Sequence, residues 1–183
     1  GLLVMAGGVG IGRFAYTPLL PPMRDALHWS VAQAGDVASA NFVGYLAGAL
    51  LAATLAQRAD RLRWLYAGML VSAMTTAGGL VIVDFAAWLA LRFVSGAASA
   101  FCLVLSTATV LEWLSARGRA ALGAAHFAGV GTGIVVSVLV IEAARVRGVS
   151  VFGQWAALGA AAVVMFTVAA AVLQRLEMAQ PAG

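Results

Sequence analysis

The chain has 183 residues, of which 63% are hydrophobic and only 10% are charged, and its mean hydropathy is +0.98. Soluble domains carry about 45–50% apolar and about 25% charged residues, so this composition excludes an ordinary water-soluble domain and favours a protein embedded in lipid. The net charge of +4 comes from scattered arginines without a basic run, so we expect no nucleic-acid partner.

Six apolar segments, each long enough to cross a bilayer, follow one another along the chain. They exceed the roughly 9–11 residues of a barrel strand and do not alternate polar with apolar positions, which predicts helices. Pro18 interrupts the first segment, Pro21-Pro22 close it, and Ser30 with Gln33 has the spacing of a capping box that begins the second. The predicted helices span 1–22, 31–57, 64–83, 86–111, 120–141 and 150–173, which gives one all-α bundle over 1–175 and the start of a cytoplasmic linker at 176–183.

The arginines of the connecting loops are distributed unevenly, and the richer side is expected to face the cytoplasm, as are both chain ends. One side holds Arg58, Arg61, Arg63, Arg117, Arg119 and Arg175. The other side holds Arg24, Arg145 and Arg147. The chain also begins inside an apolar run without a basic leader region, so we expect the native protein to start further upstream.

Two arginines fall inside predicted membrane helices. A charge at the centre of such a helix costs about 2.5–3.5 kcal/mol on insertion scales, so Arg13 is expected to face a hydrated, protein-lined cavity. Arg92 lies about two turns from a helix end, where snorkelling or a buried ion pair is the alternative. Tyr16, Asn41 and His126 are polar groups within helices, and each serves either a helix–helix hydrogen bond or a ligand contact.

Small residues at helical spacing predict close helix packing in the second segment, at Gly44 and Gly48, and in the fifth, at Gly129 and Gly133. Cys102 stands alone, and His28 and His126 lie far apart, so neither a disulfide framework nor a metal or other cofactor is expected. No Ser/His, paired-Asp or HExxH arrangement lies within the helices, which argues against an intramembrane enzyme.

Short strings repeat between the two halves of the chain. Arg13-Phe14 in the first segment parallels Arg92-Phe93 in the fourth, and the string from Ala40 to Gly44 in the second parallels the string from Ala125 to Gly129 in the fifth. Three helices repeated once place the second unit upside down in the membrane, which is the inverted repeat of secondary transporters.

On the string Gln33-Ala34-Gly35 leading into Gly44–Leu51, together with the strings from Arg92 to Ala100 and from Gly10 to Pro21, the chain resembles the major facilitator superfamily. The string from Arg92 to Ala100, which includes Ser95, is similar to the fourth-helix motif of that superfamily, whose Arg is associated with proton coupling. Asp60-Arg61 resembles a degenerate form of the gating signature between its second and third helices. The string from Gly10 to Pro21 resembles the opening of the YbfB/YjiJ-type branch.

The resemblance implies the N-terminal six-helix half of a twelve-helix transporter in the bacterial inner membrane, working with a C-terminal half. It implies that a small solute moves by alternating access, driven by protons. The pathway and its border would be formed by Arg13, Tyr16, Asn41, Arg92, Ser95 and His126. Arginines in a low-dielectric cavity attract an anionic solute or respond to a protonatable partner, and both interpretations stay open. A self-contained six-helix scaffold or oligomeric channel is the rival interpretation.

Overall fold

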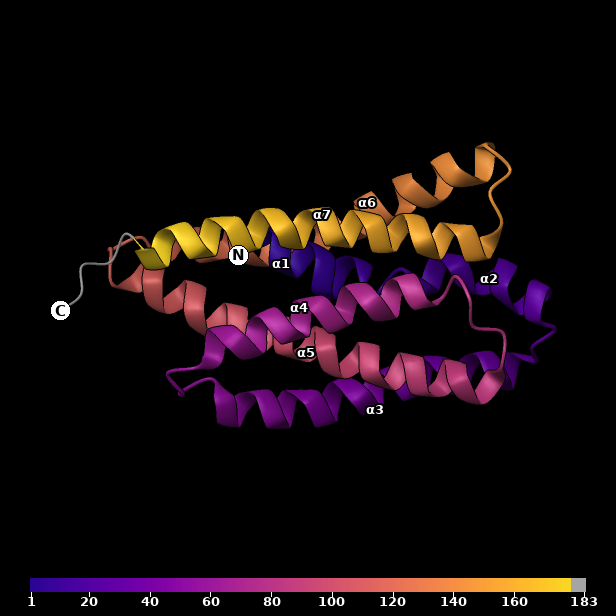
Figure 1. Ribbon diagram of the computed structural model, residues 1–183, viewed down its shortest axis with the longest axis horizontal. Coiled ribbons are helices and arrows are strands. Elements are labelled where there is room, and N and C mark those ends of the chain that lie inside the picture. The colour runs from indigo at the N-terminus through magenta and orange to yellow at the C-terminus, as the bar shows by residue number, and fades with distance from the viewer. Residues whose placement is uncertain (179–183) are drawn as a thin grey trace.

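The computed structural model describes residues 1–178, with side chains to Arg175, and within this range every regular element is helical (Figure 1). A broken first helix consists of α1 (Leu2–Met5), the π-helix η1 (Ala6–Ile11) and α2 (Tyr16–Leu27). The remaining elements are α3 (Val31–Leu55), α4 (Arg61–Gly78), α5 (Phe85–Ser115), the short 3₁₀-helix η2 (Ala120–Leu122), α6 (Gly123–Val146) and α7 (Val151–Met178). The all-α membrane class predicted from the sequence is therefore confirmed.

Five helices are long and apolar enough to cross a membrane: Leu2–Leu27, Val31–Leu55, Phe85–Ser115, Ala120–Val146 and Val151–Arg175. The exception within the described range is α4, which was expected at 64–83. Its 18 residues span about 27 Å at 1.5 Å per residue, close to a typical hydrocarbon core of about 30 Å, but Arg61 and Arg63 make it less apolar than the other long helices. It begins earlier, at the charged Arg61, and ends at Gly78, five residues before the predicted end, because two successive glycines are poor helix formers.

The first helix differs most from its predicted bounds. The interruption lies at residues 12–15 rather than at Pro18, and the helix continues past Pro21-Pro22 to Leu27. Pro18 is the third residue of α2, where a helical N–H has no intrahelical partner in any case. Pro21 and Pro22 lack the N–H groups that would bond to the carbonyls of Thr17 and Pro18. Only these two carbonyls lose a helical partner, and both residues are exposed. Proline is therefore tolerated here without ending the helix.

The other helix ends shift by a few residues. The capping box at Ser30 is formed in both directions, Gln33 N–H to Ser30 Oγ at 3.1 Å and Ser30 N–H to Gln33 Oε1 at 3.0 Å, and α3 then ends at Leu55 rather than at residue 57. Asp84 accepts from the N–H of Ala87 at 2.8 Å and starts α5, which runs four residues beyond the predicted end. Both α6 and α7 likewise extend further, so residues 176–178 of the predicted linker are helical, and residues 179–183 lie outside the described range.

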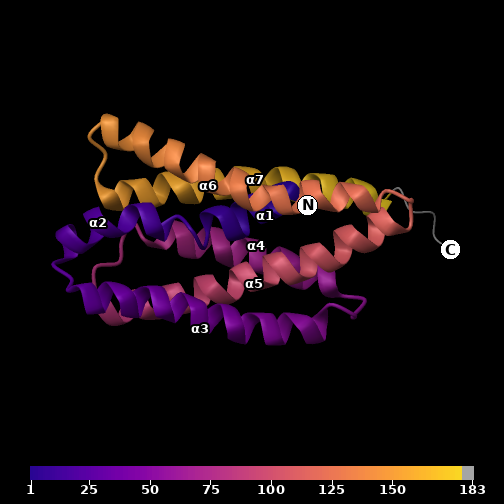
Figure 2. The same ribbon diagram turned by 180° about the vertical axis from the view of Figure 1, so that it is seen from behind.

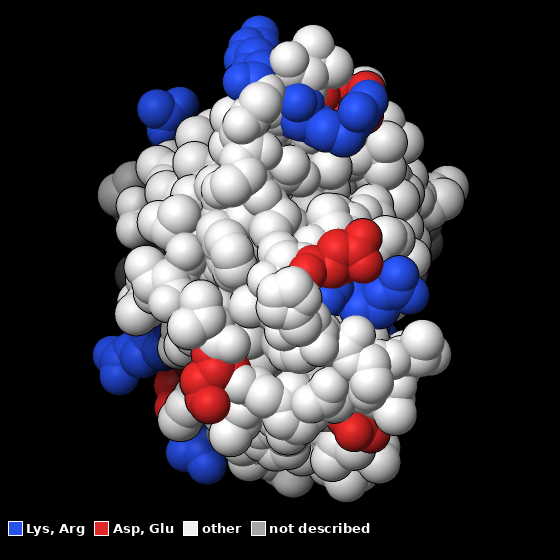
Figure 3. Space-filling model, turned by 90° about the vertical axis from the view of Figure 1, so that its right-hand side faces the viewer, with Lys and Arg blue, Asp and Glu red and all other residues white. Residues whose placement is uncertain are grey.

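The helices run roughly along the long axis of the molecule, and α3 and α6 lie at opposite edges, with the first helix, α4 and α5 between them (Figures 1 and 2). The connections α2–α3, α4–α5 and α6–α7 lie together at one end. Seen from that end, acidic and basic side chains are spread over a largely apolar face without forming a single basic patch (Figure 3).

The predicted glycine contacts join the helices in two matching pairs. A Cβ on Gly44 or Gly48 of α3 would overlap the backbone of Phe93 or Ala97 of α5. A Cβ on Gly129 or Gly133 of α6 would overlap the carbonyl oxygens of Leu2 or Ala6 in the first helix. Such backbone-to-backbone approach is the usual role of small residues in membrane helices. The contact of α3 with α5 thus has its counterpart in the contact of α6 with the first helix, as an inverted repeat requires.

The same contacts correct one detail of the proposed repeat. Gly44 meets Phe93, the residue after Arg92, whereas Gly129 meets Leu2, the residue after Gly1. Packing therefore aligns Arg92 with Gly1, and Arg13 lies about three helical turns away from the position that its sequence match suggested. Asn41 and His126 do occupy matching places, because Asn41 bonds to Arg92 and His126 lies against Gly1.

Candidate functional site

The break in the first helix is the centre of the candidate site. The N–H of Gly12 bonds back five residues to the carbonyl of Gly7 at 2.9 Å, and the N–H of Thr17 bonds to the carbonyl of Phe14 at 3.2 Å. These bonds shift the helical register, so the carbonyls of Gly12 and Arg13 are left without a helical donor in the hydrogen-bond pattern of the described chain. A buried carbonyl without a donor is costly in lipid, so both groups need partners from elsewhere.

Those partners come from α5. Arg92 donates from Nη1 to the carbonyl of Gly12 at 3.2 Å and from Nη2 to the carbonyl of Arg13 at 3.0 Å. Ser95, one turn further along, donates from its hydroxyl to the carbonyl of Gly12 at 3.0 Å. Arg92 is 3% exposed, so it neither snorkels to the membrane surface nor pairs with an acid among the described side chains. Its guanidinium instead caps the broken end of the first helix.

Tyr16 and Asn41 close this contact into a ring of three helices. The Tyr16 hydroxyl at the start of α2 donates to the carbonyl of Ala34 on α3 at 3.0 Å, and its ring lies 4.9 Å from the Arg92 guanidinium. Asn41 of α3 donates to the main-chain carbonyl of Arg92 at 3.0 Å. The first helix, α3 and α5 are therefore tied to one another at the level of the break, in the packing interior.

Arg13 projects from the same break toward α3. Its guanidinium carbon lies 4.0 Å from the ring centroid of Tyr45, 4.8 Å from that of Phe42 and 5.6 Å from that of Phe14. A guanidinium over an aromatic face gains about 0.5–1 kcal/mol at exposed sites and about 2 kcal/mol when desolvated. These rings hold the side chain in place but accept none of its strong hydrogen bonds.

Neither interior arginine has an acidic partner among the described residues. The four ion pairs of that range involve other arginines, at the ends of the helices. The Nε atoms of Arg13 and Arg92 are both buried and lack a hydrogen-bond partner in the described chain. Arg92 donates from its Nη atoms to backbone carbonyls, whereas the Arg13 side chain makes no hydrogen bond within the described residues. Arg13 is thus a half-buried cation whose side-chain donors have no partner among the described residues.

The structure does not bring His126 into this group. His126 is 3% exposed and lies toward the other end of the bundle, with Nε2 3.1 Å from the hydroxyl of Thr107. A Cβ on Gly1 would stand 2.6 Å from its Nδ1 atom. The side chain therefore packs where α6, α5 and the start of the first helix meet.

The predicted gating loop lies at that same end of the molecule. Arg61 forms an ion pair with Glu112 near the end of α5 and donates to the carbonyl of Ala56 at 3.3 Å. Arg58 Nε lies 3.2 Å from a carboxylate oxygen of Asp60; desolvation raises the pKa of Asp60, but hydrogen bonding and the charge of Arg58 outweigh it and lower the pKa overall. Exposed pairs of this kind contribute little to stability because water and salt screen the charges, so the loop is held by weak, reversible contacts.

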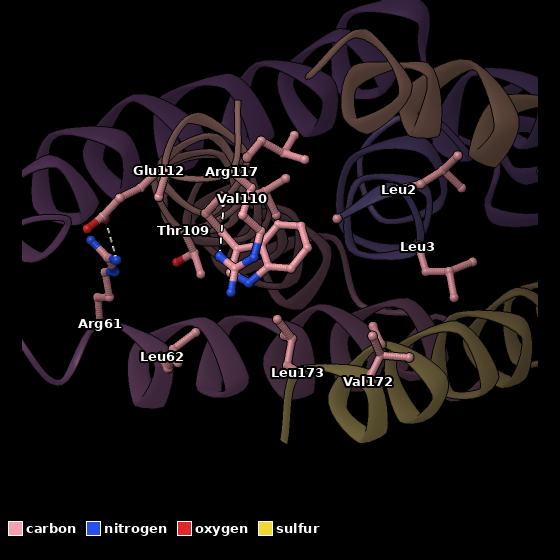
Figure 4. Close-up of a pocket in the computed structure, with 15 residues that line it drawn as sticks. Leu2, Leu3, Arg61, Leu62, Thr109, Val110, Glu112, Arg117, Val172 and Leu173 are labelled. Carbon is pink, nitrogen blue, oxygen red and sulfur yellow. Dashed lines mark hydrogen bonds and ion pairs between the residues drawn. The ribbon is translucent and has the colours of Figure 1, made fainter. Parts of the chain in front are cut away.

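A cavity of about 580 Å³ opens beside this loop (Figure 4). Its walls come from α1, α4, α5 and α7, and Arg61 and Glu112 stand at one side of it. Arg117 stacks on Trp113 at 4.0 Å and points into the same space. The sequence patterns did not predict Glu112, Trp113 and Arg117 as site residues. The available signal was a second loop with charges of both signs on the same predicted side of the membrane as Asp60-Arg61. The sequence strings that contain Phe42 and Tyr45 did not mark them as site residues, because only their contact with Arg13 does so.

These features define a multi-pass membrane protein with a broken helix stabilised inside an inverted-repeat bundle. Residues 5–183 match the family described as "Uncharacterised MFS-type transporter YbfB", and the chain belongs to this family of the major facilitator superfamily. The resemblance noted from the first-helix and fourth-helix strings is thereby confirmed.

Curated relatives carry the same class of name. An uncharacterized MFS-type transporter of Yersinia pestis (strain Pestoides F) is 31% identical over 109 residues, which are 60% of this chain and 28% of that relative. YceJ of Bacillus subtilis is 32% identical over 96 residues (51% and 24%), and YcaD of Escherichia coli O139:H28 is 30% identical over 126 residues (69% and 32%). The aligned part thus covers a third or less of each relative. No solved structure matches the chain significantly.

Proposed function

We propose that this chain is the N-terminal half of a secondary transporter that moves a small solute by alternating access, with Arg13 in the solute pathway. The observation that carries the proposal is the unpaired guanidinium of Arg13 at the break of the first helix. A membrane protein retains a charge at this depth at a cost of about 2.5–3.5 kcal/mol, and the described residues offer no acid that would make it a purely structural ion pair.

Arg92 and Ser95 act as positioning residues in this proposal. They hold the carbonyls of Gly12 and Arg13, so they fix the backbone from which the Arg13 side chain projects. Rocking of one six-helix unit against another would then move the first helix, α3 and α5 together, because Tyr16 and Asn41 tie them. The Arg13 guanidinium would then move together with the first helix.

The proposed partners are the bilayer of the bacterial inner membrane, a C-terminal six-helix half and protons. None of the described acidic side chains pairs with Arg13 or Arg92. We propose that the proton of a coupled cycle is accepted by the second half or by the solute itself. We place both ends of the chain in the cytoplasm, because the arginine-rich loops lie at the end of the bundle where α7 finishes, and Gly1 lines a cavity together with Arg61 and Arg117. The proposed activity is transport without a chemical reaction.

Uptake by the full-length protein in proteoliposomes tests this function. A panel of radiolabelled organic anions, sugars and cations is offered with an imposed pH gradient and again after the gradient is collapsed by an ionophore. The proposal expects concentrative uptake of at least one solute that depends on the gradient. Equilibration that is insensitive to the gradient would instead support a channel.

A further inference from the structure

A groove runs between α2 and α6 directly beside the helix break. It has a volume of about 330 Å³, in the range of small-ligand sites. Its wall is nearly all apolar and consists of Phe14, Thr17, Pro18, Ile134, Ser137 and Val138. The Ser137 hydroxyl is already bonded to the carbonyl of Gly133 at 2.8 Å. Thr17 thus contributes the main polar side chain that is free to meet a ligand.

Phe14 joins this groove to Arg13. Its ring lines the groove and also lies 5.6 Å from the Arg13 guanidinium carbon. An apolar space of small-molecule size and a cation with free donors are therefore neighbours across one aromatic ring.

Resting on the transporter function proposed above, we infer that the solute is a small organic acid, whose carboxylate binds Arg13 and whose apolar body occupies the groove. A planar carboxylate matches the two-donor fork of a guanidinium. A sugar requires many polar partners, and the groove has few. A cation is repelled by Arg13, and an inorganic anion leaves the groove empty.

Binding to the full-length protein in nanodiscs tests the inference, with benzoate as the probe, benzamide as its neutral counterpart and inorganic phosphate as an anion without an apolar body. Titration calorimetry is expected to detect benzoate at least tenfold more tightly than either of the others. Arg13→Gln is expected to weaken benzoate at least tenfold and to leave benzamide unchanged.

Two further variants test the groove itself. Val138→Trp fills the groove and is expected to abolish benzoate binding. Val135→Trp places the same bulk on an exposed position of the same helix that does not line the groove, and it is expected to bind benzoate as the unmodified protein does. Equal loss in both variants, or equal affinity for benzoate and benzamide, overturns the inference.

Failure of the inference and failure of the transporter function give different results. If the full-length protein takes up a sugar or a cation and does not bind benzoate, the solute class is wrong while the transport function stands. If benzoate binds through Arg13 and the groove but no solute is concentrated by proteoliposomes, the binding site stands and the transport function fails.

Discussion

The Nη2 atom of Arg92 donates to the main-chain carbonyl oxygen of Arg13 at 3.0 Å. The two arginines of the membrane interior are thus linked through the backbone, and they have different tasks. Arg92 donates hydrogen bonds to carbonyls that the broken helix leaves without donors. The side chain of Arg13 lies against aromatic rings, and its N–H groups have no hydrogen-bond partner among the described residues. Substitutions at the two positions should therefore have separable effects.

Replacing Arg92 with Met should loosen the helix break locally. A hydrogen bond to a charged group contributes about 1.5–3 kcal/mol, and the carbonyl of Arg13 has no other donor in the described chain. Loss of the buried charge offsets part of this, so the change in overall melting temperature should be small. Hydrogen–deuterium exchange of peptides covering residues 12–17 should rise at least tenfold.

Ser95→Ala is the matched control for this prediction. The carbonyl of Gly12 keeps Arg92 as a donor when the serine hydroxyl is removed, so exchange should rise by less than in Arg92→Met. Equal exchange in Arg92→Met and the unmodified protein would show that Arg92 does not stabilise the break.

The glycines of α6 should differ sharply in their tolerance of alanine. Gly133→Ala places a Cβ against the carbonyl oxygen of Ala6 and should push α6 away from the first helix, lowering stability by about 1–3 kcal/mol as overpacking does. Gly131, two residues earlier, has open space within 4 Å of the position that a Cβ would take, so Gly131→Ala should be neutral or gain up to about 1 kcal/mol of helix propensity. Thermal unfolding in detergent compares the two, and equal melting temperatures would contradict the described packing.

The orientation in the membrane can be read from single cysteines. Cysteines introduced at Arg61 and Arg117 should react with an impermeant maleimide only from the cytoplasmic side, and one at Arg147 only from outside. The native Cys102 is fully buried and should contribute little background. Labelling of the Arg61 and Arg147 positions from the same side would refute the proposed topology.

The sequence was sufficient to predict the helices, because hydropathy, the Ser30 capping box and the small-residue faces are local signals. The place of the helix break was not predictable in this way. Prolines suggested Pro18, but the break lies where α5, some eighty residues further along the chain, supplies donors through Arg92 and Ser95. A long-range contact therefore overrides the local signal, and the same limit applies to the groove and to the rings that hold Arg13.

The central claim is that the charge of Arg13 serves the solute rather than the fold, and uptake by Arg13→Gln in proteoliposomes of the full-length protein tests it most directly. Losing the aromatic contacts costs about 0.5–2 kcal/mol. Removing the charge from the membrane interior gains about 2.5–3.5 kcal/mol, which is more than this cost. Melting temperature should therefore be maintained, while uptake falls at least tenfold and Arg13→Lys restores it only in part, because an ammonium lacks the planar fork. A stable Arg13→Gln protein with unchanged uptake would contradict the account.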